Sequence, residues 1–494
     1  MSIETSSQRR SAIGAQNSSN RISLPSLRLR TSERKLLLLL VDLLIVNLAL
    51  IASIHIGWHE PVPASLLLAS TKWYITLAAA WVVGALFFDL YDLARAASTS
   101  TIVRSAAPAA LLTALVYSLI PNLTPTLGSR TQIFVLMGLM GVGIVVWRVA
   151  YSQFFVQPQF RQRALVIGAG WAGRTLATAL RVAPHDANPY RGTGYELVGF
   201  IDDNPAFHDA TVEGIPVLGG QESLVSLAQA LKIDEVIVAI THRHAIQDAL
   251  FDDLLRCREL GIHISTMPDL YERLLLRVPV QHVGRDLNRA LPSADTAYQR
   301  LFSIAKRLID LVGALVGLVF LALLMPALAL ANRLGSPGPL FYRQARVGRR
   351  GQLFHVIKFR SMIPDAEAAS GAVWAADNDP RITAVGRFLR RTRLDELPQV
   401  INVLRGEMSL IGPRPERPEF VEQLAHSIPF YRARHSVRPG LSGWAQVQYR
   451  YGNTADDSRV KLEYDLYYVK HAGFLLDLRI ALQTIGVMLA FKGH

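Results

Sequence analysis

Two adjacent acidic residues, Asp395 and Glu396, follow a group of arginines in the C-terminal third of the chain. The arginines are Arg390, Arg391 and Arg393. Pro398 disfavours helical geometry at the residue before it and is tolerated in a first helical turn, so residues 399–404 are predicted to open a helix with both acids at its N-terminal end. Amide and guanidinium groups would then face one small volume, which suits a phosphate, a divalent cation and an ionised nucleophilic carboxylate. The alternative is an ordinary N-capping acid with a solvated neighbour.

Six further motifs surround this carboxylate pair. They occupy residues 336–344 (SPGPLFYRQ), 346–348 (RVG), 358–362 (KFRSM), 379–383 (DPRIT), 385–387 (VGR) and 408–416 (MSLIGPRPE). The ordered set resembles the bacterial sugar transferases, the polyprenyl-phosphate hexose-1-phosphate transferases that begin exopolysaccharide, capsule and O-antigen assembly. The resemblance covers roughly residues 298–494. The whole chain resembles the large form of the family, in which membrane helices and a nucleotide-binding-like domain precede the transferase domain.

The resemblance implies a covalent mechanism, with Asp395 as the nucleophile, Glu396 as a magnesium ligand and Arg390 as a phosphate-binding arginine. Asp395 would attack the β-phosphorus of a UDP-hexose and expel UMP, and undecaprenyl phosphate would then take up the hexose-1-phosphate. A covalent intermediate predicts ping-pong kinetics, and magnesium binds through one or two carboxylates plus substrate phosphates. The sugar is predicted to be glucose, because large members of the family commonly handle glucose or galactose. An N-acetylhexosamine is the alternative.

Further residues are predicted to bind the substrates. They are Lys358, Arg360, Pro413, Arg414, Pro415, Trp444 and Gln446. Lys358 and Arg360 would stabilise charge during phosphoryl transfer. Two prolines stiffen the loop around Arg414, which would therefore lose little entropy on meeting the nucleotide, although an ordinary rigid turn is the alternative. By the resemblance, Trp444 and Gln446 would lie near the base or the sugar.

The composition indicates an integral membrane protein. Of the 494 residues, 50% are hydrophobic, and the formal net charge is +13. Because the chain carries no nucleic-acid-binding motif, this positive charge is predicted to face anionic lipid headgroups and phosphorylated substrates rather than nucleic acid. Cys257 is the single cysteine, which excludes an intramolecular disulfide.

Four apolar blocks fill the first third of the chain, at residues 35–56, 73–90, 102–120 and 133–151. Each is near the roughly 20 residues that cross a bilayer as a helix, so residues 32–155 are predicted to form four transmembrane helices. Basic residues are concentrated before the first block, whereas the connector to the second holds only Lys72. This asymmetry places the N-terminus in the cytoplasm and the catalytic domain on the cytoplasmic face of the bacterial inner membrane. Residues 1–31 are predicted to be a disordered basic tail.

Residues 161–290 show the pattern of a Rossmann-like α/β domain. A short strand at residues 164–167 leads into Gly168, Gly170 and Gly173, which fit GxGxxG, and a second strand ends at Asp202. This acid lies further along the chain than the roughly 20 residues of the dinucleotide fingerprint. The domain is predicted either to bind a nucleotide or to be a regulatory or structural module, with homodimerisation as one such role.

Residues 301–332 begin with Lys306, Arg307 and Asp310 and continue as an apolar run that contains Pro326. The run is long enough for a fifth transmembrane span. Spanning would place the carboxylate pair away from cytosolic nucleotide sugars, so we predict a re-entrant helix that breaks at Pro326, the geometry that the resemblance also implies. The predicted fold is a membrane α-helical bundle, a cytosolic Rossmann-like α/β domain and an α/β membrane-associated transferase domain, residues 298–494, with this re-entrant helix.

The end of the chain is predicted to lie at the bilayer surface. Residues 449–470, which include Asp465, would form an amphipathic helix along the membrane, and residues 472–490 a further interfacial helix.

Two other functions were compatible with parts of the pattern. A membrane nucleotide-sugar dehydratase needs a Tyr-x-x-x-Lys pair, which Tyr190, Tyr195, Tyr271 and Tyr298 do not form. A catalytically silent scaffold of the same fold would have no physical need for the carboxylate pair, Arg390 and the loop around Arg414 together.

Overall fold

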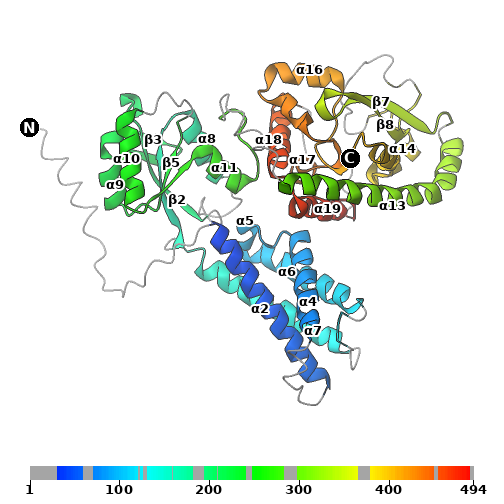
Figure 1. Cartoon of the computed structure of the whole chain (residues 1–494), viewed down its shortest axis with the longest axis horizontal. Coiled ribbons are helices and arrows are strands. Elements are labelled where there is room, and N and C mark those ends of the chain that lie inside the picture. The colour runs from blue at the N-terminus through cyan, green and yellow to red at the C-terminus, as the bar shows by residue number, and fades with distance from the viewer. Residues whose placement is uncertain are drawn as a thin grey trace, which may run out of the picture.

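The computed structural model describes residues 31–58, 70–120, 123–125, 131–157, 160–181, 194–207, 210–240, 247–282, 297–335, 337–364, 366, 379–449 and 454–489. The predicted basic tail lies outside these residues except for Thr31, which begins the first helix. Ser336 of the 336–344 motif also lies outside them. The chain forms a helical bundle, a Rossmann-like domain and a transferase domain that carries the carboxylate pair (Figure 1).

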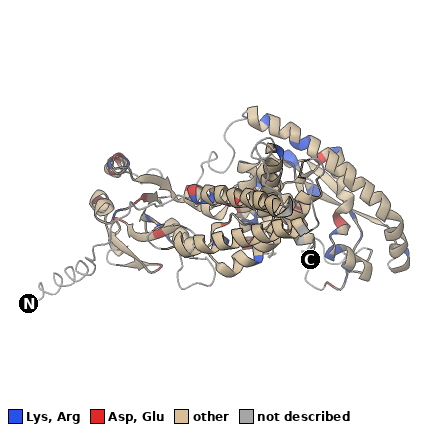
Figure 2. Ribbon diagram, turned by 90° about the horizontal axis from the view of Figure 1, so that it is seen from below, with Lys and Arg blue, Asp and Glu red and all other residues tan. Residues whose placement is uncertain are grey.

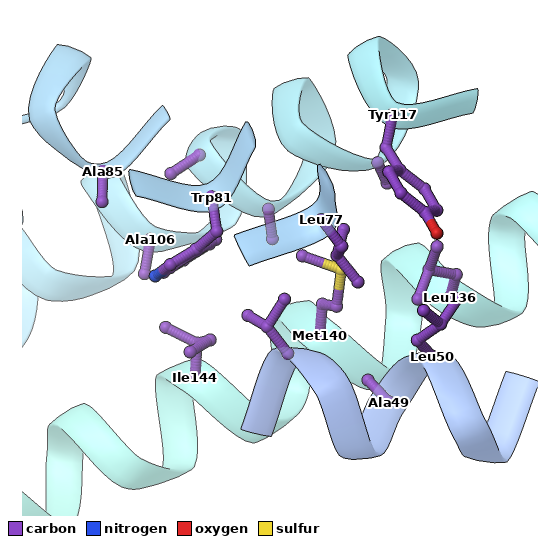
Figure 3. Packing of buried hydrophobic residues seen from close by; sticks show 14 of the residues in the cluster. Ala49, Leu50, Leu77, Trp81, Ala85, Ala106, Tyr117, Leu136, Met140 and Ile144 are labelled. Atoms are coloured by element: carbon purple, nitrogen blue, oxygen red, sulfur yellow. The ribbon is translucent and has the colours of Figure 1, made fainter. Parts of the chain in front are cut away.

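The N-terminal bundle consists of α2 (Thr31–Trp58), α4 (Thr71–Phe87), α5 (Leu93–Ala96), α6 (Thr99–Ser118) and α7 (Thr131–Phe154). Trp81 and Leu77 of α4 share its core with Met140 and Ile144 of α7 (Figure 3). On α2, leucines at four-residue intervals such as Leu36 remain exposed, as expected of a face in contact with lipid. Helices lie at all four predicted positions, and their crossing of a membrane stays a prediction. By length and composition α2, α6 and α7 can cross a membrane, whereas α4, with 17 residues, is shorter.

The Rossmann-like domain alternates strands and helices, as predicted. Its elements are β1 (Gln162–Ile167), α8 (Trp171–Arg181), β2 (Tyr195–Ile201), η2 (Pro205–Phe207), β3 (Thr211–Val212), β4 (Ile215–Gly219), η3 (Gln221–Ser223), α9 (Leu224–Ala230), β5 (Glu235–Val238), α10 (Asp248–Glu259), β6 (His263–Thr266) and α11 (Met267–Leu275). The sheet order is β3-β4-β2-β1-β5-β6, and every pair is parallel except β3 with β4. Separate apolar cores cover its two faces, which is the architecture of a doubly wound sheet.

The transferase domain begins with the long helix α13 (Ala297–Gly335) and a hairpin of β7 (Phe341–Val347) and β8 (Leu353–Phe359) with η5 (Arg349–Gly351) at its turn. The elements that follow are α14 (Ala384–Arg391), η6 (Leu394–Gln399), α15 (Val400–Arg405), β9 (Ser409–Ile411), α16 (Pro418–Ser427), η7 (Tyr431–Ser436), β10 (Gly440–Ser442), α17 (Trp444–Gln448), α18 (Ala455–His471) and α19 (Phe474–Leu489). Strands β9 and β10 pair in parallel and bring two loops together beside the carboxylate pair.

Helix α13 contacts the transferase domain at both of its ends. Near its start, Arg307 donates to the carbonyl oxygens of Val403 and Leu404, at 2.7 and 3.0 Å. Near its end, the Asn332 side-chain oxygen accepts a hydrogen bond at 2.9 Å from the guanidinium of Arg360, which follows β8. The helix is continuous through Pro326, so the predicted break is not an interruption of helical structure. Instead, Figure 1 shows the helix turning away from its first axis toward its C-terminal end.

Apolar side chains cover much of α13 with few charges among them. Its exposed residues include Leu308, Val312, Val319 and Leu323, and the stretch from residue 311 to residue 332 carries no charged side chain. Figure 2 shows the same sparseness of charge along the long apolar helices. By length and composition α13 is also able to cross a membrane.

Helix α18 lies inside the protein rather than on a membrane surface, which corrects the prediction for residues 449–470. Glu463, Asp465 and Leu466 are among its buried residues. Figure 1 shows α18 between the Rossmann-like and transferase domains. From α11, Glu272 pairs with Lys470 at 2.9 Å and with His471 at 2.5 Å. The amphipathic pattern was misleading because partners within the protein satisfy the polar side chains.

Helix α19 joins the transferase domain to the membrane bundle. From α19, the Arg479 guanidinium lies 2.9 Å from the Asp89 carboxylate, which follows α4. The amide of Gln483 donates to both oxygens of the same carboxylate, at 2.7 and 2.8 Å. The end of the catalytic domain is therefore fixed to the helical bundle.

Candidate active site

The carboxylate pair lies in the first turn of η6, which leads directly into α15. The predicted helical start is present, but it begins at Leu394 as a 3₁₀ helix rather than at Gln399. Arg393 adopts left-handed backbone geometry, with φ 60°, which turns the chain into η6. The Asp395 side chain is buried at 9% exposure.

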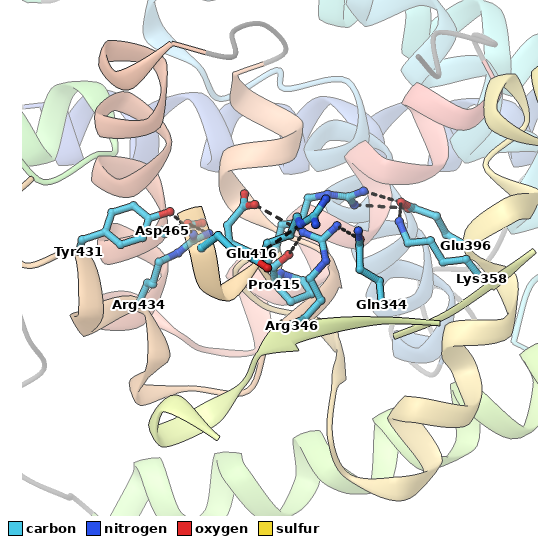
Figure 4. A network of polar contacts seen from close by, with 12 residues as sticks. Gln344, Arg346, Lys358, Glu396, Pro415, Glu416, Tyr431, Arg434 and Asp465 are labelled. Carbon is cyan, nitrogen blue, oxygen red and sulfur yellow. Dashed lines mark hydrogen bonds and ion pairs between the residues drawn. The ribbon is translucent and has the colours of Figure 1, made fainter. Parts of the chain in front are cut away.

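Three cationic side chains converge on Glu396. Arg414 lies 2.5 Å from Oε1 through Nη2 and 3.4 Å from Oε2 through Nη1. Lys358 of β8 lies 3.2 Å from Oε1, and Arg393 lies 3.7 Å from Oε2. Figure 4 shows the contacts of Glu396 with Lys358. The structure thus brings together four residues that the sequence marked separately.

The surroundings shift the pKa values of the two acids in opposite directions. Burial alone would raise the pKa of Glu396, but the positive charges of Arg414 and Lys358 hold it well below its usual range. Burial and the charge of Glu396 raise the pKa of Asp395 to about 6, although Lys358, Arg414 and Arg390 act in the opposite direction. The sequence predicted that arginines would favour ionised Asp395. The arginines do lower the pKa of Asp395, but burial raises it by more.

Asp395 and Glu396 also differ in their direct partners. Within the described part of the chain, no side chain forms an ion pair with the Asp395 carboxylate, whereas Glu396 has three such partners. One acid is therefore fixed as an anion in a network. The other is a buried carboxylate next to positive charge, which is the arrangement of a nucleophile that titrates near neutral pH.

Arg390 approaches the same volume from the last turn of α14. Its Nε donates to the Ser361 hydroxyl at 2.8 Å, and its charge lowers the pKa of Asp395. The phosphate-binding role of Arg390 stays a prediction.

Two loops that run side by side hold Arg414. The Gly412 amide donates to the Ser442 carbonyl oxygen at 2.8 Å, and the Gly440 amide donates to the Pro413 carbonyl oxygen at 2.9 Å. A Cβ atom on Gly412 would lie 2.4 Å from the Arg438 carbonyl oxygen, so only glycine permits this approach. The prolines on either side restrict the backbone further. The predicted stiff loop around Arg414 is present.

Two other arginines support this loop, and sequence reasoning did not predict either contact, although Arg346 belongs to the 346–348 motif. Arg434 of η7 donates to the Arg414 carbonyl oxygen at 2.9 Å, and Arg346 of β7 donates to the Pro415 carbonyl oxygen at 3.1 Å. Both arginines stood among many basic residues, with no local signal for a buried contact. Their partners are 20 and 69 residues away in the sequence.

Some predicted substrate-binding residues have structural roles instead. The Arg360 guanidinium donates to the Pro339 carbonyl oxygen at 2.7 Å and to the Asn332 side chain at 2.9 Å, so it fixes the end of α13. Trp444 is fully buried and donates through Nε1 to the Leu276 carbonyl oxygen at 2.9 Å. Gln446 lies on the same short helix α17, and no described polar contact links it to the carboxylate pair. The predicted contact of Trp444 with base or sugar is wrong because the indole packs in the interior.

The glycine-rich turn of the Rossmann-like domain has the predicted shape. Gly168 adopts φ 103°, and a Cβ atom on Gly173 would lie 2.1 Å from the Gly168 carbonyl oxygen. Gly170 has open space around it. The Asp202 carboxylate, however, accepts a hydrogen bond from the Ala169 amide at 2.7 Å. Nucleotide binding here stays a prediction, and so does homodimerisation through this domain.

Two family descriptions match parts of the chain. The family described as bacterial sugar transferase matches residues 301–491, and the family described as CoA-binding domain matches residues 86–268. The chain is 33% identical to a UDP-N-acetylgalactosamine-undecaprenyl-phosphate N-acetylgalactosaminephosphotransferase of Aeromonas hydrophila, over 89% of this chain and 98% of that protein.

Two relatives named for glucose are also similar. A UDP-glucose:undecaprenyl-phosphate glucose-1-phosphate transferase of Xanthomonas campestris pv. campestris is 35% identical, over 60% of this chain and 61% of that protein. A protein of the same name from Escherichia coli (strain K12) is 32% identical, over 70% of this chain and 75% of that protein.

Proposed function

Because the chain belongs to the bacterial sugar transferase family, we propose that it transfers a sugar-1-phosphate from a UDP-sugar to undecaprenyl phosphate at a membrane surface. The relatives are named for this reaction with N-acetylgalactosamine or glucose. The observation that carries the proposal is the buried Asp395 carboxylate beside an anionic Glu396 held by Lys358 and Arg414. Such a site offers one nucleophile and several groups that bind phosphate.

In the first step, an oxygen of Asp395 attacks the β-phosphorus of the donor. The bond from that phosphorus to the bridging oxygen breaks, UMP leaves with the electron pair, and the sugar-1-phosphoryl group stays on the aspartate. Arg414 and Arg390 bind the phosphate oxygens, and Lys358 stabilises the charge that develops on them. In the second step, a phosphate oxygen of undecaprenyl phosphate attacks the same phosphorus. Asp395 leaves as a carboxylate and is ready for another turnover.

The carboxylate pair fits magnesium by the chemistry of its donor atoms. In the described part of the chain, no group of three or more His, Cys, Asp or Glu side chains could hold a metal ion. Magnesium suits a site with one or two carboxylates, because it takes its other ligands from substrate phosphates and water. Glu396, with Asp395 beside it, would hold the ion, which when bound neutralises charge on the diphosphate.

In this proposal, helix α13 enters the bilayer and holds the site at its surface. A straight α-helix of 39 residues is about 58 Å long, well beyond the roughly 30 Å of a hydrocarbon core. Contacts of both ends with one folded domain support a helix that enters one leaflet and returns. A re-entrant helix would keep the transferase domain on the proposed cytoplasmic face of the inner membrane, where UDP-sugars are available.

Two donors are candidates. The sequence favoured UDP-glucose, and two of the relatives are named for glucose. UDP-N-acetylgalactosamine has equal claim, because the relative that matches nearly its full length is named for this sugar. Both share the uridine diphosphate that Arg414, Arg390 and Lys358 would bind.

Release of UMP tests the proposed function directly. The full-length protein in nanodiscs is given undecaprenyl phosphate, magnesium and, separately, UDP-glucose, UDP-galactose, UDP-N-acetylglucosamine or UDP-N-acetylgalactosamine. Release with one donor, matched by formation of a polyprenyl diphosphate sugar, is the expected result. Absence of release with all four donors would overturn the proposal for these sugars and favour the silent scaffold.

A further inference from the structure

Arg434 is a buried charge close to the site but not in contact with the carboxylate pair. Its side chain is 6% exposed, and the paired Asp465 side chain on α18 is 2% exposed. Nη2 lies 2.6 Å from Asp465 and 2.9 Å from the Arg414 carbonyl oxygen, and Nη1 lies 2.9 Å from the Tyr431 hydroxyl. Figure 4 shows this chain of contacts from Tyr431 and Asp465 toward Glu396.

The loop around Arg414 is held at two successive carbonyl groups. Arg434 donates to the carbonyl oxygen of Arg414 itself, and Arg346 of β7 donates to the carbonyl oxygen of Pro415. With its backbone fixed on both sides, the Arg414 side chain extends to Glu396. The direction of this guanidinium therefore depends on groups that do not reach the substrates.

A buried ion pair is a weak source of stability, because removing two charges from water costs about as much as their attraction returns. Burial raises the pKa of Asp465 to about 6 even though Arg434 lowers it, which reflects this cost. A pair of this kind is better explained by the geometry it imposes. Hydrogen bonds from a charged donor are also stronger than neutral ones, so the Arg414 carbonyl is held firmly.

We propose that Arg434, held by Asp465, is a positioning residue that directs Arg414 toward the nucleotide phosphates of the donor. The inference rests on the proposed function, since it assigns the donor side of that reaction to Arg414. Arginine is required because its planar fork reaches three acceptors from two nitrogen atoms. The single nitrogen of lysine cannot hold all three in the same directions.

The principal experiment compares Arg434→Lys with Arg432→Lys in the full-length protein in nanodiscs. Arg432 lies on the same 3₁₀ helix η7 but is exposed, so its variant has the same change of chemistry without the buried contacts. Two readouts are used: the Kd of UDP with magnesium, and the KM values for the UDP-sugar and for undecaprenyl phosphate. We expect Arg434→Lys to weaken UDP binding and raise the donor KM by about tenfold, with the acceptor KM within about twofold. Arg432→Lys should leave all three values unchanged.

A double variant separates positioning from a general structural effect. If Arg434 acts only through Arg414, then Arg414→Lys with Arg434→Lys binds UDP no more weakly than Arg414→Lys alone. If the two residues acted independently, the fold-losses in UDP affinity of the two single variants would multiply in the double variant. Tyr431→Phe removes one hydroxyl from the network without changing charge, and it should shift UDP binding in the same direction by a smaller factor.

Unchanged UDP affinity in folded Arg434→Lys, equal changes in both KM values, or multiplying losses in the double variant would each overturn the inference. If Arg434→Lys fails to fold, Tyr431→Phe and the conservative Asp465→Asn provide the same test. Failure of the wild-type protein to transfer any sugar would count against the proposed function, whereas UDP binding tests the positioning role separately.

Discussion

Two aspartates of this molecule each lie beside a turn that leads into a helix, and their surroundings are opposite. In the Rossmann-like domain, Asp202 accepts hydrogen bonds from the backbone amides of Ala169 and Asn204, at 2.7 and 2.9 Å. In the transferase domain, Asp395 has a pKa raised to about 6 by burial and by Glu396, with Lys358 and Arg414 close by. The backbone satisfies the first carboxylate. The second remains available for chemistry.

The difference shows that the shape of a turn is weaker evidence of function than the charges that converge on it. The glycine-rich turn has a positive φ at Gly168 and a close backbone approach at Gly173, as its sequence pattern predicts. Its aspartate nevertheless stabilises the turn itself. At the carboxylate pair, four cationic side chains from separate segments gather in one volume: Lys358, Arg390, Arg393 and Arg414. Gathering like charges has an electrostatic cost, which binding of phosphate would offset.

The largest expected effect comes from the same substitution at each aspartate. Asp395→Asn removes the nucleophile, so UMP release should fall by more than about 10⁴-fold and covalent labelling by radioactive donor should vanish. Asp202→Asn should change UMP release by less than about twofold. Both variants are checked for folding by size exclusion in nanodiscs. Appreciable turnover by folded Asp395→Asn would rule out the covalent mechanism.

A second pair of substitutions compares arginines of the two regions. Arg414→Lys keeps the charge beside Glu396 but loses the two-nitrogen contact, so donor kcat/KM should fall by about 10²-fold. Arg174→Lys, at an exposed position of α8, should leave donor kcat/KM unchanged. The measurement is the initial rate of UMP release at low donor concentration. Equal effects of the two variants on donor kcat/KM would mean that the cationic side chains around Glu396 are no more important for donor use than an exposed arginine of the Rossmann-like domain.

The raised pKa of Asp395 predicts a loss of reactivity in acid. Protonated Asp395 is not a nucleophile, so the rate should be constant above the pKa of about 6 and fall about tenfold per pH unit below it. The burst of UMP formed without undecaprenyl phosphate isolates this step from titration of the acceptor phosphate. A burst rate that stays constant down to pH 5 would show that the neighbouring cations outweigh burial in the functional state.

The carboxylate pair was predictable because its signal is local. Asp395, Glu396, Arg390, Lys358 and Arg414 belong to short motifs with fixed spacing, and the structure brings them together. The four apolar helices of the N-terminal bundle and the alternating Rossmann-like elements were predictable for a similar reason, since hydrophobic length and periodicity are properties of one segment.

The supporting contacts were not predictable, because they join distant segments. Asp465 was predicted to lie on an amphipathic helix along the membrane but is buried against Arg434, 31 residues away. Trp444 stood in a family motif, yet its indole packs inside and reaches Leu276 across 168 residues. Burial decides the role of each side chain, and burial depends on the packing of whole domains rather than on local pattern.

The smallest expected effect concerns the stability of the glycine-rich turn. Asp202→Ala leaves the Ala169 amide without its charged acceptor, which should cost about 1 kcal/mol of local stability. In a protein of several domains a single unfolding free energy is not well defined, so the readout is hydrogen exchange of peptides that span residues 164–176. Exchange should be about fivefold faster. Asp252→Ala, at an exposed position of α10, should leave exchange unchanged.

The same variant also tests whether the two regions are independent. Helix α11 follows the last strand of the Rossmann-like sheet, and its Glu272 pairs with Lys470 of α18. Five positions earlier, Asp465 of α18 holds Arg434, which binds the Arg414 carbonyl. If loosening the glycine-rich turn left UMP release within twofold, the contacts along this path would not transmit changes in the Rossmann-like domain to the donor site. If release fell as strongly as in Arg414→Lys, the contrast between the regions would fail, because the Rossmann-like domain would then control the donor site through α18.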